Sequence, residues 1–245
     1  DALQEDLTIL ENWEQKWDMS FNATKCEHIL FSRKRTPTEH PLTIHNTTIP
    51  RTKQTKYLGV LVDDGLTFKQ HVASITGKAS SKLGLLRRNV QTSSQDIKAM
   101  AYKQMIRPTL EYASAAWDRL GKSLEKDIKA VQRWAARTTC NINITDRSTS
   151  TTKLLADLEW DPLATRRKHR RLVVFNSYHH QRQNIILEHL NPKVTHNNRR
   201  HSEQYLIPHC STKHHQKSFF IRTGADWNCL PPDSQYLVHR QIASS

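Results

Sequence analysis

Two adjacent carboxylates, Asp63 and Asp64, are the residues whose type and spacing most suggest metal chemistry. Paired carboxylates can hold two divalent cations about 3.5–4 Å apart, an arrangement that supports in-line displacement at phosphorus. The pair is followed directly by Gly65, and clusters of Asp and Gly are typical of turns. The sequence therefore favours a turn over a metal site here, and we assign no residue of this chain as a metal ligand.

Lysine and arginine dominate the charge of this chain. The 245 residues include 37 Lys or Arg and 23 Asp or Glu, which gives a net charge of +14 and a pI of about 9.8. The excess is concentrated in residues 163–222, where twelve cations and two carboxylates give +10. Such a field attracts polyanions, and nucleic acid is the usual one. The alternative is an ordinary basic soluble protein.

The densest run of cations extends from Thr165 to Arg171. Five cations within six residues at the start of a helix cannot share one face, so some must point to solvent or to phosphate. Three interpretations stay open: contact with backbone phosphates, a nuclear localisation signal, or a solvated helix face. The candidate phosphate-binding residues are Arg166, Arg167, Lys168, Arg170 and Arg171.

Histidine and cysteine raise the possibility of zinc in residues 196–215. Cys210 and His214 are spaced like one pair of zinc ligands, but a structural zinc site needs a second pair and none is evident. Solvated or phosphate-facing histidines are the favoured alternative. The four cysteines form no C-x-x-C pair, which is typical of reduced thiols in an intracellular protein, with nucleus and cytoplasm both possible. No apolar run approaches the roughly 20 residues of a membrane span.

The first 66 residues predict one amphipathic helix and several strands. Apolar residues recur at spacings of three and four across residues 2–17, which places Leu3, Leu7, Leu10, Trp13 and Trp17 on one helix face. The expected strands are residues 27–32, a hairpin at residues 42–49 that turns near Asn46, and a buried strand at residues 56–62.

From residue 67 the periodicity becomes helical. Thr67 and Gln70 form a capping box before a first helix that continues to about residue 90. Ser94 can start a second helix, Pro108 a further turn or a kink, and Ser123 another helix. Inward positions on the second helix are expected to be Ile97, Met100, Ala101 and Met105, and the tryptophans expected in the core are Trp13, Trp17, Trp117 and Trp134.

These elements predict an α+β fold: a small antiparallel sheet with one packed helix, then a mainly helical region, then a helical basic C-terminal region. The expected parts are residues 1–66, residues 67–140, a polar linker at 141–152, and residues 153–245.

Several segments, taken in order, resemble one family. Trp13-x-x-x-Trp17-x-Met19-x-x-Asn22-x-x-Lys25-Cys26, followed by Tyr57-Leu58-Gly59-Val60, resembles the end of the palm domain of non-LTR retrotransposon (LINE-type, jockey-like) reverse transcriptases. His71 and Leu83-Gly84-Leu85-Leu86-Arg87 resemble the first thumb helix. The thumb signature Pro-x-Leu-x-Tyr-x-x-x-x-Trp matches residues 108–117, and residues 219–231 resemble the C-terminal tail.

The resemblance implies roles for two palm sites. It assigns to Lys25 the position of a general acid, or of a positive charge, beside the pyrophosphate leaving group of polymerisation. The alternative is a solvated surface lysine. Tyr57-Leu58-Gly59 takes the position of the primer grip, where glycine lets another backbone approach closely. The alternative is a glycine in a buried strand with no ligand.

The resemblance also implies partners. A thumb would hold an RNA–DNA hybrid of RNA template and DNA primer through its backbone, and the candidate contacts are Lys78, Lys82, Arg87 and Arg88. The fingers, the metal-binding aspartates of the family and any endonuclease have no counterpart here. We therefore expect no independent polymerase activity and no cofactor in this chain, with Mg²⁺ and the N-terminal part belonging to the intact enzyme. The alternatives are a domesticated or decayed nucleic-acid-binding fragment without enzymatic activity, or a pseudogene product with no function.

Overall fold

The computed structural model describes residues 2–32, 34–35, 40–143, 146, 148–180, 190–192 and 204–231. The chain divides into two compact units, residues 1–71 and residues 72–245. Helices and small antiparallel sheets occur together, which confirms the α+β class. None of the helices in the described part of the chain combines the length and the apolar character that crossing a bilayer requires.

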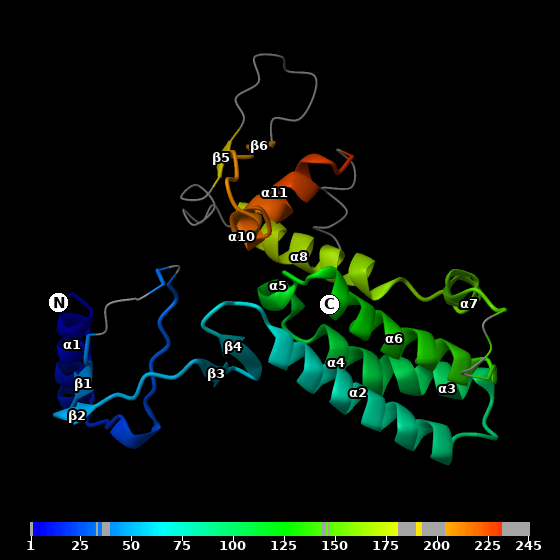
Figure 1. Cartoon of the computed structure of the whole chain (residues 1–245), viewed down its shortest axis with the longest axis horizontal. Helices are drawn as coiled ribbons and strands as arrows, with labels where there is room; N and C mark the ends of the chain where they lie inside the picture. Colours follow the sequence, from blue (N-terminus) through cyan, green and yellow to red (C-terminus); the bar gives the residue numbers. More distant parts are fainter. Residues whose placement is uncertain are drawn as a thin grey trace. The chain divides into compact units, whose positions relative to one another are not determined.

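The first unit is built on one helix and two hairpins (Figure 1). The predicted N-terminal helix is confirmed, and its Gln4 side chain bonds both the N–H and the C=O of Thr43 on a neighbouring strand. The core of the unit consists of Leu42, Ile44 and Ile49, with Leu7 packed against them. Its elements are α1 (Ala2–Trp17), η1 (Ala23–Lys25), β1 (Thr43–Ile44), β2 (Thr47–Thr48), β3 (Gln54–Tyr57) and β4 (Val60–Asp63).

Two strand predictions in this unit are wrong. Residues 27–32 form no strand, because His28 makes only an isolated parallel bridge to Arg51 and the segment finds no longer partner among the described residues. Residues 56–62 are split by a turn into β3 and β4, which pair in the register Tyr57↔Val60. The hairpin turning near Asn46 is confirmed, with His45 and Asn46 both at positive φ.

The carboxylate of Asp63 explains how the next helix starts. It accepts hydrogen bonds from the backbone N–H groups of Thr67 and Phe68, each at 2.8 Å. These two residues lie just before α2, so Asp63, at the end of β4, fixes the turn that leads into the helix. This finding agrees with the interpretation of Asp63-Asp64-Gly65 as a turn. Oγ1 of Thr67 accepts a hydrogen bond from the N–H of Lys69 at 3.5 Å, and the capping box expected between Thr67 and Gln70 is not formed.

The second unit is mainly helical. In Figure 1 its first helices lie side by side, and the later helix α8 packs against α5, α6 and α11. A small strand pair, Asn191↔Leu206 and Pro192↔Tyr205, lies beside α11. Its elements are α2 (Lys69–Asn89, which starts in the first unit), α3 (Gln95–Ala101), η2 (Tyr102–Ile106), α4 (Arg107–Glu111), α5 (Ser114–Trp117), α6 (Lys122–Thr139), α7 (Thr151–Asp157), α8 (Leu163–His180), β5 (Asn191–Pro192), β6 (Tyr205–Leu206), α10 (Lys213–Gln216) and α11 (Phe219–Asn228).

The inward face predicted for the second helix is wrong. Ser94 caps α3 as expected, but Ile97, Met100 and Met105 are exposed. The buried positions are Lys98, Tyr102 and Ile106, and the apolar pattern missed them because a lysine interrupts it. The π-helical turn η2 directly precedes α4, in which Pro108 has no N–H to donate. The N–H of Arg107 donates to the carbonyl of Tyr102, five residues earlier, which is the hydrogen bond of a π-helix. Pro108 itself lies at the start of α4, as predicted.

Tryptophan burial also differs from expectation. Trp117 is fully buried and its indole N–H donates to the carbonyl of Tyr112 at 2.8 Å, but Trp13, Trp17 and Trp134 are exposed. The helix α6 begins at Lys122 after Gly121, so Ser123 is not its cap.

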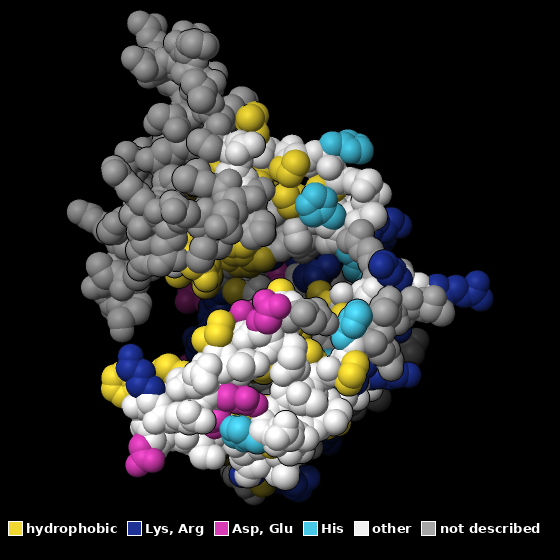
Figure 2. Space-filling view, turned by 90° about the vertical axis from the view of Figure 1, so that its left-hand side faces the viewer, with side chains coloured by type: hydrophobic (Ala, Val, Ile, Leu, Met, Phe, Trp, Pro, Cys, Tyr) yellow, Lys and Arg dark blue, Asp and Glu magenta, His cyan; other side chains and the backbone are white. Residues whose placement is uncertain are grey.

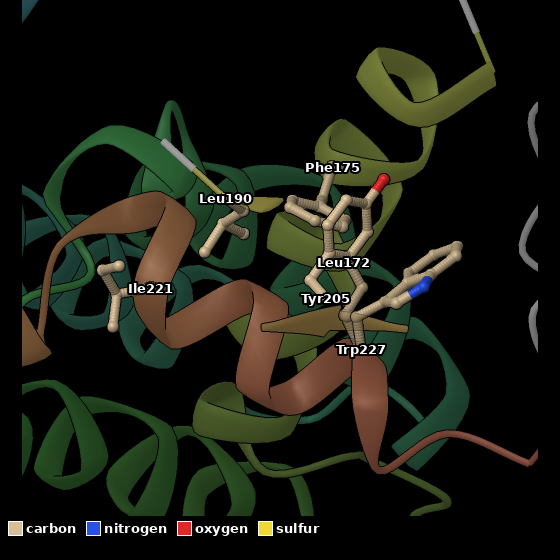
Figure 3. Packing of buried hydrophobic residues seen from close by; sticks show 6 residues of the cluster. All are labelled: Leu172, Phe175, Leu190, Tyr205, Ile221 and Trp227. Atoms are coloured by element: carbon tan, nitrogen blue, oxygen red, sulfur yellow. The ribbon is translucent and has the colours of Figure 1, made fainter. Parts of the chain in front are cut away.

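A hydrophobic cluster in the C-terminal part of this unit packs α8 against α11 and β6 (Figure 3). Its buried residues are Leu172, Phe175, Leu190, Tyr205, Ile221 and Trp227. Phe175 of α8 packs against both Tyr205 and Trp227, whose ring centroids lie 5.4 and 5.5 Å from its own. Gly224 allows the close packing of α11, because a Cβ at this position would lie 2.7 Å from Leu190. The linker predicted at residues 141–152, between the helical region and the basic C-terminal region, stays a prediction. Part of this segment is tied to α6, because Arg137 donates hydrogen bonds to the backbone carbonyls of Asn143 and Thr149.

Candidate nucleic-acid interface

The tip of the β3–β4 hairpin carries the predicted primer-grip residues. Leu58 and Gly59 form a two-residue turn with φ of 45° and 87°, the left-handed values that a tight hairpin turn requires. Tyr57 is 69% exposed and Leu58 is 74% exposed. The alternative of a glycine in a buried strand is therefore wrong, and the sequence instead presents two large apolar side chains and a glycine at an exposed tip.

The base of this hairpin is held by a histidine. His71, near the start of α2, is 2% exposed, and its Nδ1 accepts a hydrogen bond from the N–H of Leu61 at 3.3 Å. This contact ties β4 to the helix that follows it. The hairpin tip is thus presented from a supported base.

Lys25 lies at the end of the short helix η1 and is exposed. Asn22 caps this helix by accepting a hydrogen bond from the N–H of Thr24 at 3.0 Å, and the N–H of Lys25 donates to the carbonyl of Asn22 at 3.0 Å. The Asn-x-x-Lys segment is therefore one compact turn. Among the described residues, no hydrogen bond or ion pair joins Lys25 to the hairpin tip, and its chemical role stays a prediction.

The four cations predicted on the first thumb helix all lie on α2 and are exposed. Successive helical residues are rotated by about 100°, so Lys78 and Arg87, nine positions apart, point to opposite sides. The Nζ of Lys82 donates to the carbonyl of Met105 at 3.1 Å and to Oγ1 of Thr109 at 2.8 Å, so part of its capacity is used within the fold. Lys78 and Lys82 therefore lie on one flank of the helix and Arg87 on the other, while Arg88, ten positions from Lys78, lies between them on the outer face.

The outer face of α2, opposite its buried face, has little side-chain bulk. A methyl group added at Gly77 would meet no atom within 4 Å. The helix α2 contains no Asp or Glu. Its cations are Lys69, Lys78, Lys82, Arg87 and Arg88. The outer-face residues that share small size are Ala73, Gly77, Ser81 and Gly84.

The cations of α8 have internal partners, which corrects the interpretation of this run as solvent- or phosphate-facing. Arg167 and Arg171 are each 2% exposed and both bind the buried carboxylate of Asp118, with Arg167 at 2.8 Å. Arg171 also lies 2.5 Å from Asp226. Burial leaves these two side chains no surface for a phosphate.

The remaining cations of the run are also paired. Lys168 binds Asp226 at 2.8 Å, and Arg170 binds the buried Glu111 at 3.0 Å. Arg166 contacts Glu111 as well, and this hydrogen bond raises the pKa of Arg166 above its usual value. Because Lys168 and Arg170 remain partly exposed, their contact with phosphate stays a prediction.

The ion pairs of this network hold the carboxylate of Asp226 in its charged form. Burial acts to raise the pKa of Asp226, but hydrogen bonds from Lys168 and Arg171 outweigh burial and hold the pKa below its usual value. Sequence reasoning included Glu111 only as part of a signature and missed Asp118 and Asp226. A lone carboxylate far along the chain from its arginines gives no signal of pairing.

Metal ligation finds no support in the described residues, which contain no group of three or more His, Cys, Asp or Glu side chains placed to hold an ion. Much of the His-rich segment, residues 196–203, lies outside the described residues. On the face shown in Figure 2, exposed hydrophobic side chains are interspersed with acidic, cationic and histidine side chains.

Part of the chain is similar to polymerases of insect transposons. It is 31% identical over 141 residues to the probable RNA-directed DNA polymerase from transposon X-element of Drosophila melanogaster, a match that covers 56% of this chain and 15% of that protein. It is 31% identical over 135 residues to the RNA-directed DNA polymerase from mobile element jockey of Drosophila funebris, covering 54% of this chain and 15% of the relative.

A third relative extends the match. The chain is 24% identical over 167 residues to the retrovirus-related Pol polyprotein from type-1 retrotransposable element R1 of Bradysia coprophila, covering 66% of this chain and 17% of that protein. The chain thus spans about 15–17% of the length of these curated relatives. No protein-family model and no solved structure matches the chain.

Proposed function

We infer from this kinship with the RNA-directed DNA polymerases of non-LTR retrotransposons that the chain binds an RNA–DNA hybrid as the primer-grip and thumb part of such a polymerase. In this proposal, α2 lies against the hybrid and the β3–β4 tip approaches the primer strand. Lys25 would supply a positive charge or a proton to the pyrophosphate leaving group.

The observation that carries the proposal is the composition and exposure of α2. At a rise of about 1.5 Å per residue its 21 residues are about 32 Å long, a length comparable to one helical turn of a nucleic-acid duplex. One face is buried in the fold, the outer face carries small residues from Ala73 to Gly84 followed by Arg88, and cations stand on both flanks with no carboxylate between them. A bare face flanked by cations lets a phosphate backbone approach closely and be held on two sides.

The ion pairs of α8 favour this assignment over the alternative that residues 163–222 are the main binding surface. In the described part of that stretch, the cations of the run from Arg166 to Arg171 neutralise internal carboxylates. They therefore have less charge to offer a polyanion than the unneutralised helix α2.

Polymerase chemistry is not proposed for this chain by itself. The carboxylate of Asp63 accepts hydrogen bonds from the N–H groups of Thr67 and Phe68 in the turn before α2, which is a structural task that competes with holding a metal ion. The proposed partners of the chain are the hybrid, the N-terminal part of a polymerase and, in that whole enzyme, Mg²⁺. Metal-dependent primer extension by the purified chain would contradict this part of the proposal.

The hybrid-binding proposal is tested by charge reversal on α2. Fluorescence anisotropy with a labelled RNA–DNA hybrid compares the unaltered chain with the double variant Arg87→Glu/Arg88→Glu. We expect affinity to fall by at least about tenfold, and the slope of log K against log salt to flatten by about 2, because two phosphate contacts are lost.

The matched control is Lys122→Glu/Lys126→Glu on α6, which changes the net charge by the same amount at exposed positions away from α2. This control should retain most of the affinity and its salt slope. Equal losses in the two double variants would mean that binding follows net charge alone, and the role of α2 would be rejected.

A further inference from the structure

A pocket of about 650 Å³ lies in the second unit and is lined by residues at the C-terminal ends of α2 and α6 and by Lys98 of α3. Two cations, Arg87 and Lys98, line it, and no carboxylate does. Its volume falls within the range of about 300–1,000 Å³ that is usual for small-molecule sites. The other lining residues are Val90, Gln91, Thr138, Asn141, Ile142 and Asn143.

Lys98 is unusual because its charge is buried without a carboxylate. Its side chain is 2% exposed, and its Nζ donates to the carbonyl of Gln91 at 2.8 Å and to Oδ1 of Asn141 at 2.5 Å. Both acceptors are neutral, and an ammonium has three N–H donors. The structure records no carboxylate partner for Lys98 among the residues it describes. Removing such a charge from water is costly, and the C-terminal ends of α2 and α6 offset only part of that cost.

Arg87 complements this buried cation. It is exposed and lines the same pocket, so a ligand arriving from solvent can meet its planar guanidinium, which suits bidentate contact with phosphate. The side chains of Gln91, Thr138 and Asn143 add uncharged hydrogen-bonding groups. This combination fits a ligand with one anionic group and a polar, uncharged body.

We propose that this pocket binds one nucleotide of a nucleic-acid strand, with its phosphate against the cations of Arg87 and Lys98. The presence of the strand rests on the proposed function, and the pocket adds a defined site at one end of α2. The opposite flank, with Lys78 and Lys82, would contact the backbone without such a pocket.

The test uses the full chain and a fluorescently labelled nucleoside monophosphate as probe. We expect Arg87→Gln to weaken binding of the probe by about tenfold, because one charge-assisted contact is lost. Lys126→Gln removes the same charge at an exposed position on α6, outside the pocket lining, and should change binding by less than about twofold. Asn143→Asp, which puts a negative charge into the exposed rim, should weaken binding without touching the buried Lys98.

Absence of probe binding, or equal effects of Arg87→Gln and Lys126→Gln, would overturn the proposal. Two competitors then identify the ligand. An RNA–DNA hybrid should displace the probe, and inorganic phosphate should compete far more weakly than the nucleotide. Equal competition by phosphate would overturn the assignment to a nucleotide, and a hybrid that binds without displacing the probe would overturn the assignment to a strand. A hybrid that does not bind at all is measured directly by anisotropy and would reject the proposed function instead.

Discussion

The two units of this chain bury their apolar and charged groups very differently. The first unit buries a cluster of Leu42, Ile44 and Ile49, together with Val60 and Phe68, while large side chains of α1 and the loop after it remain exposed. The second unit buries Trp117, Trp227 and Phe175, and it also buries the paired charges of Arg167, Arg171 and Asp118. The exposed large apolar side chains of the first unit's helix and loops include Trp13, Trp17, Met19, Phe21 and Phe31.

This difference teaches which unit can supply its own stability. Burial of apolar area is the main favourable contribution to folding, so a unit that leaves its tryptophans in water gains little from them. The second unit carries its stabilising contacts within itself, whereas the exposed tryptophans of α1 add little to the stability of the first unit.

The largest expected effect comes from Asp118. Its replacement in Asp118→Ala would leave the buried guanidinium of Arg167 without its carboxylate and remove one of the two carboxylates that bind Arg171. Breaking a buried ion pair from one side costs about 3–5 kcal/mol, and we expect a loss near the upper end. Urea denaturation followed by circular dichroism measures it. The control Asp161→Asn removes an exposed carboxylate 3.8 Å from Arg166 and should cost less than about 0.5 kcal/mol.

A pair of tryptophan truncations tests the comparison directly. Trp227→Ala would empty part of the core around Phe175 and should reduce the free energy of unfolding by about 3 kcal/mol. Trp17→Ala removes a side chain that is 60% exposed and should cost less than about 0.5 kcal/mol. Chemical denaturation of both variants gives the two values. Similar losses would show that α1 is packed in solution and that the contrast between the units is wrong.

A smaller effect is expected from the acid dependence of Asp226. Its folded-state pKa is lowered, so its ion pairs contribute stability above the usual Asp pKa of about 3.9. That contribution disappears as the pH falls through the lower folded-state pKa. Asp226→Asn should therefore be less stable than the unaltered chain at neutral pH, and the difference should shrink below about pH 4. Denaturation at a series of pH values checks this, and a constant difference would contradict it.

Local sequence signals predicted several elements of this chain correctly. The periodicity of residues 2–17, the turn at Asn46, the cap at Ser94 and the helix start at Pro108 all depend on interactions within a few residues. The resemblance of separate segments to one polymerase family was also legible in the sequence, and the similar relatives confirm it. The α+β class was predictable as well, because the hydrophobic periodicity of each segment indicates helix or strand locally.

Other features depended on groups that are distant along the chain. The sequence determined that α2 is a cationic helix without carboxylates and that Tyr57-Leu58-Gly59 can form a turn. Only the tertiary structure decided that Arg167 and Arg171 face inward, because their partner Asp118 lies about fifty residues earlier. It alone decided that Lys98 is buried beside Asn141, 43 residues away. A charged side chain is polar in any sequence pattern, and whether it faces water or a buried counter-charge depends on which distant group the fold brings within a few ångströms of it.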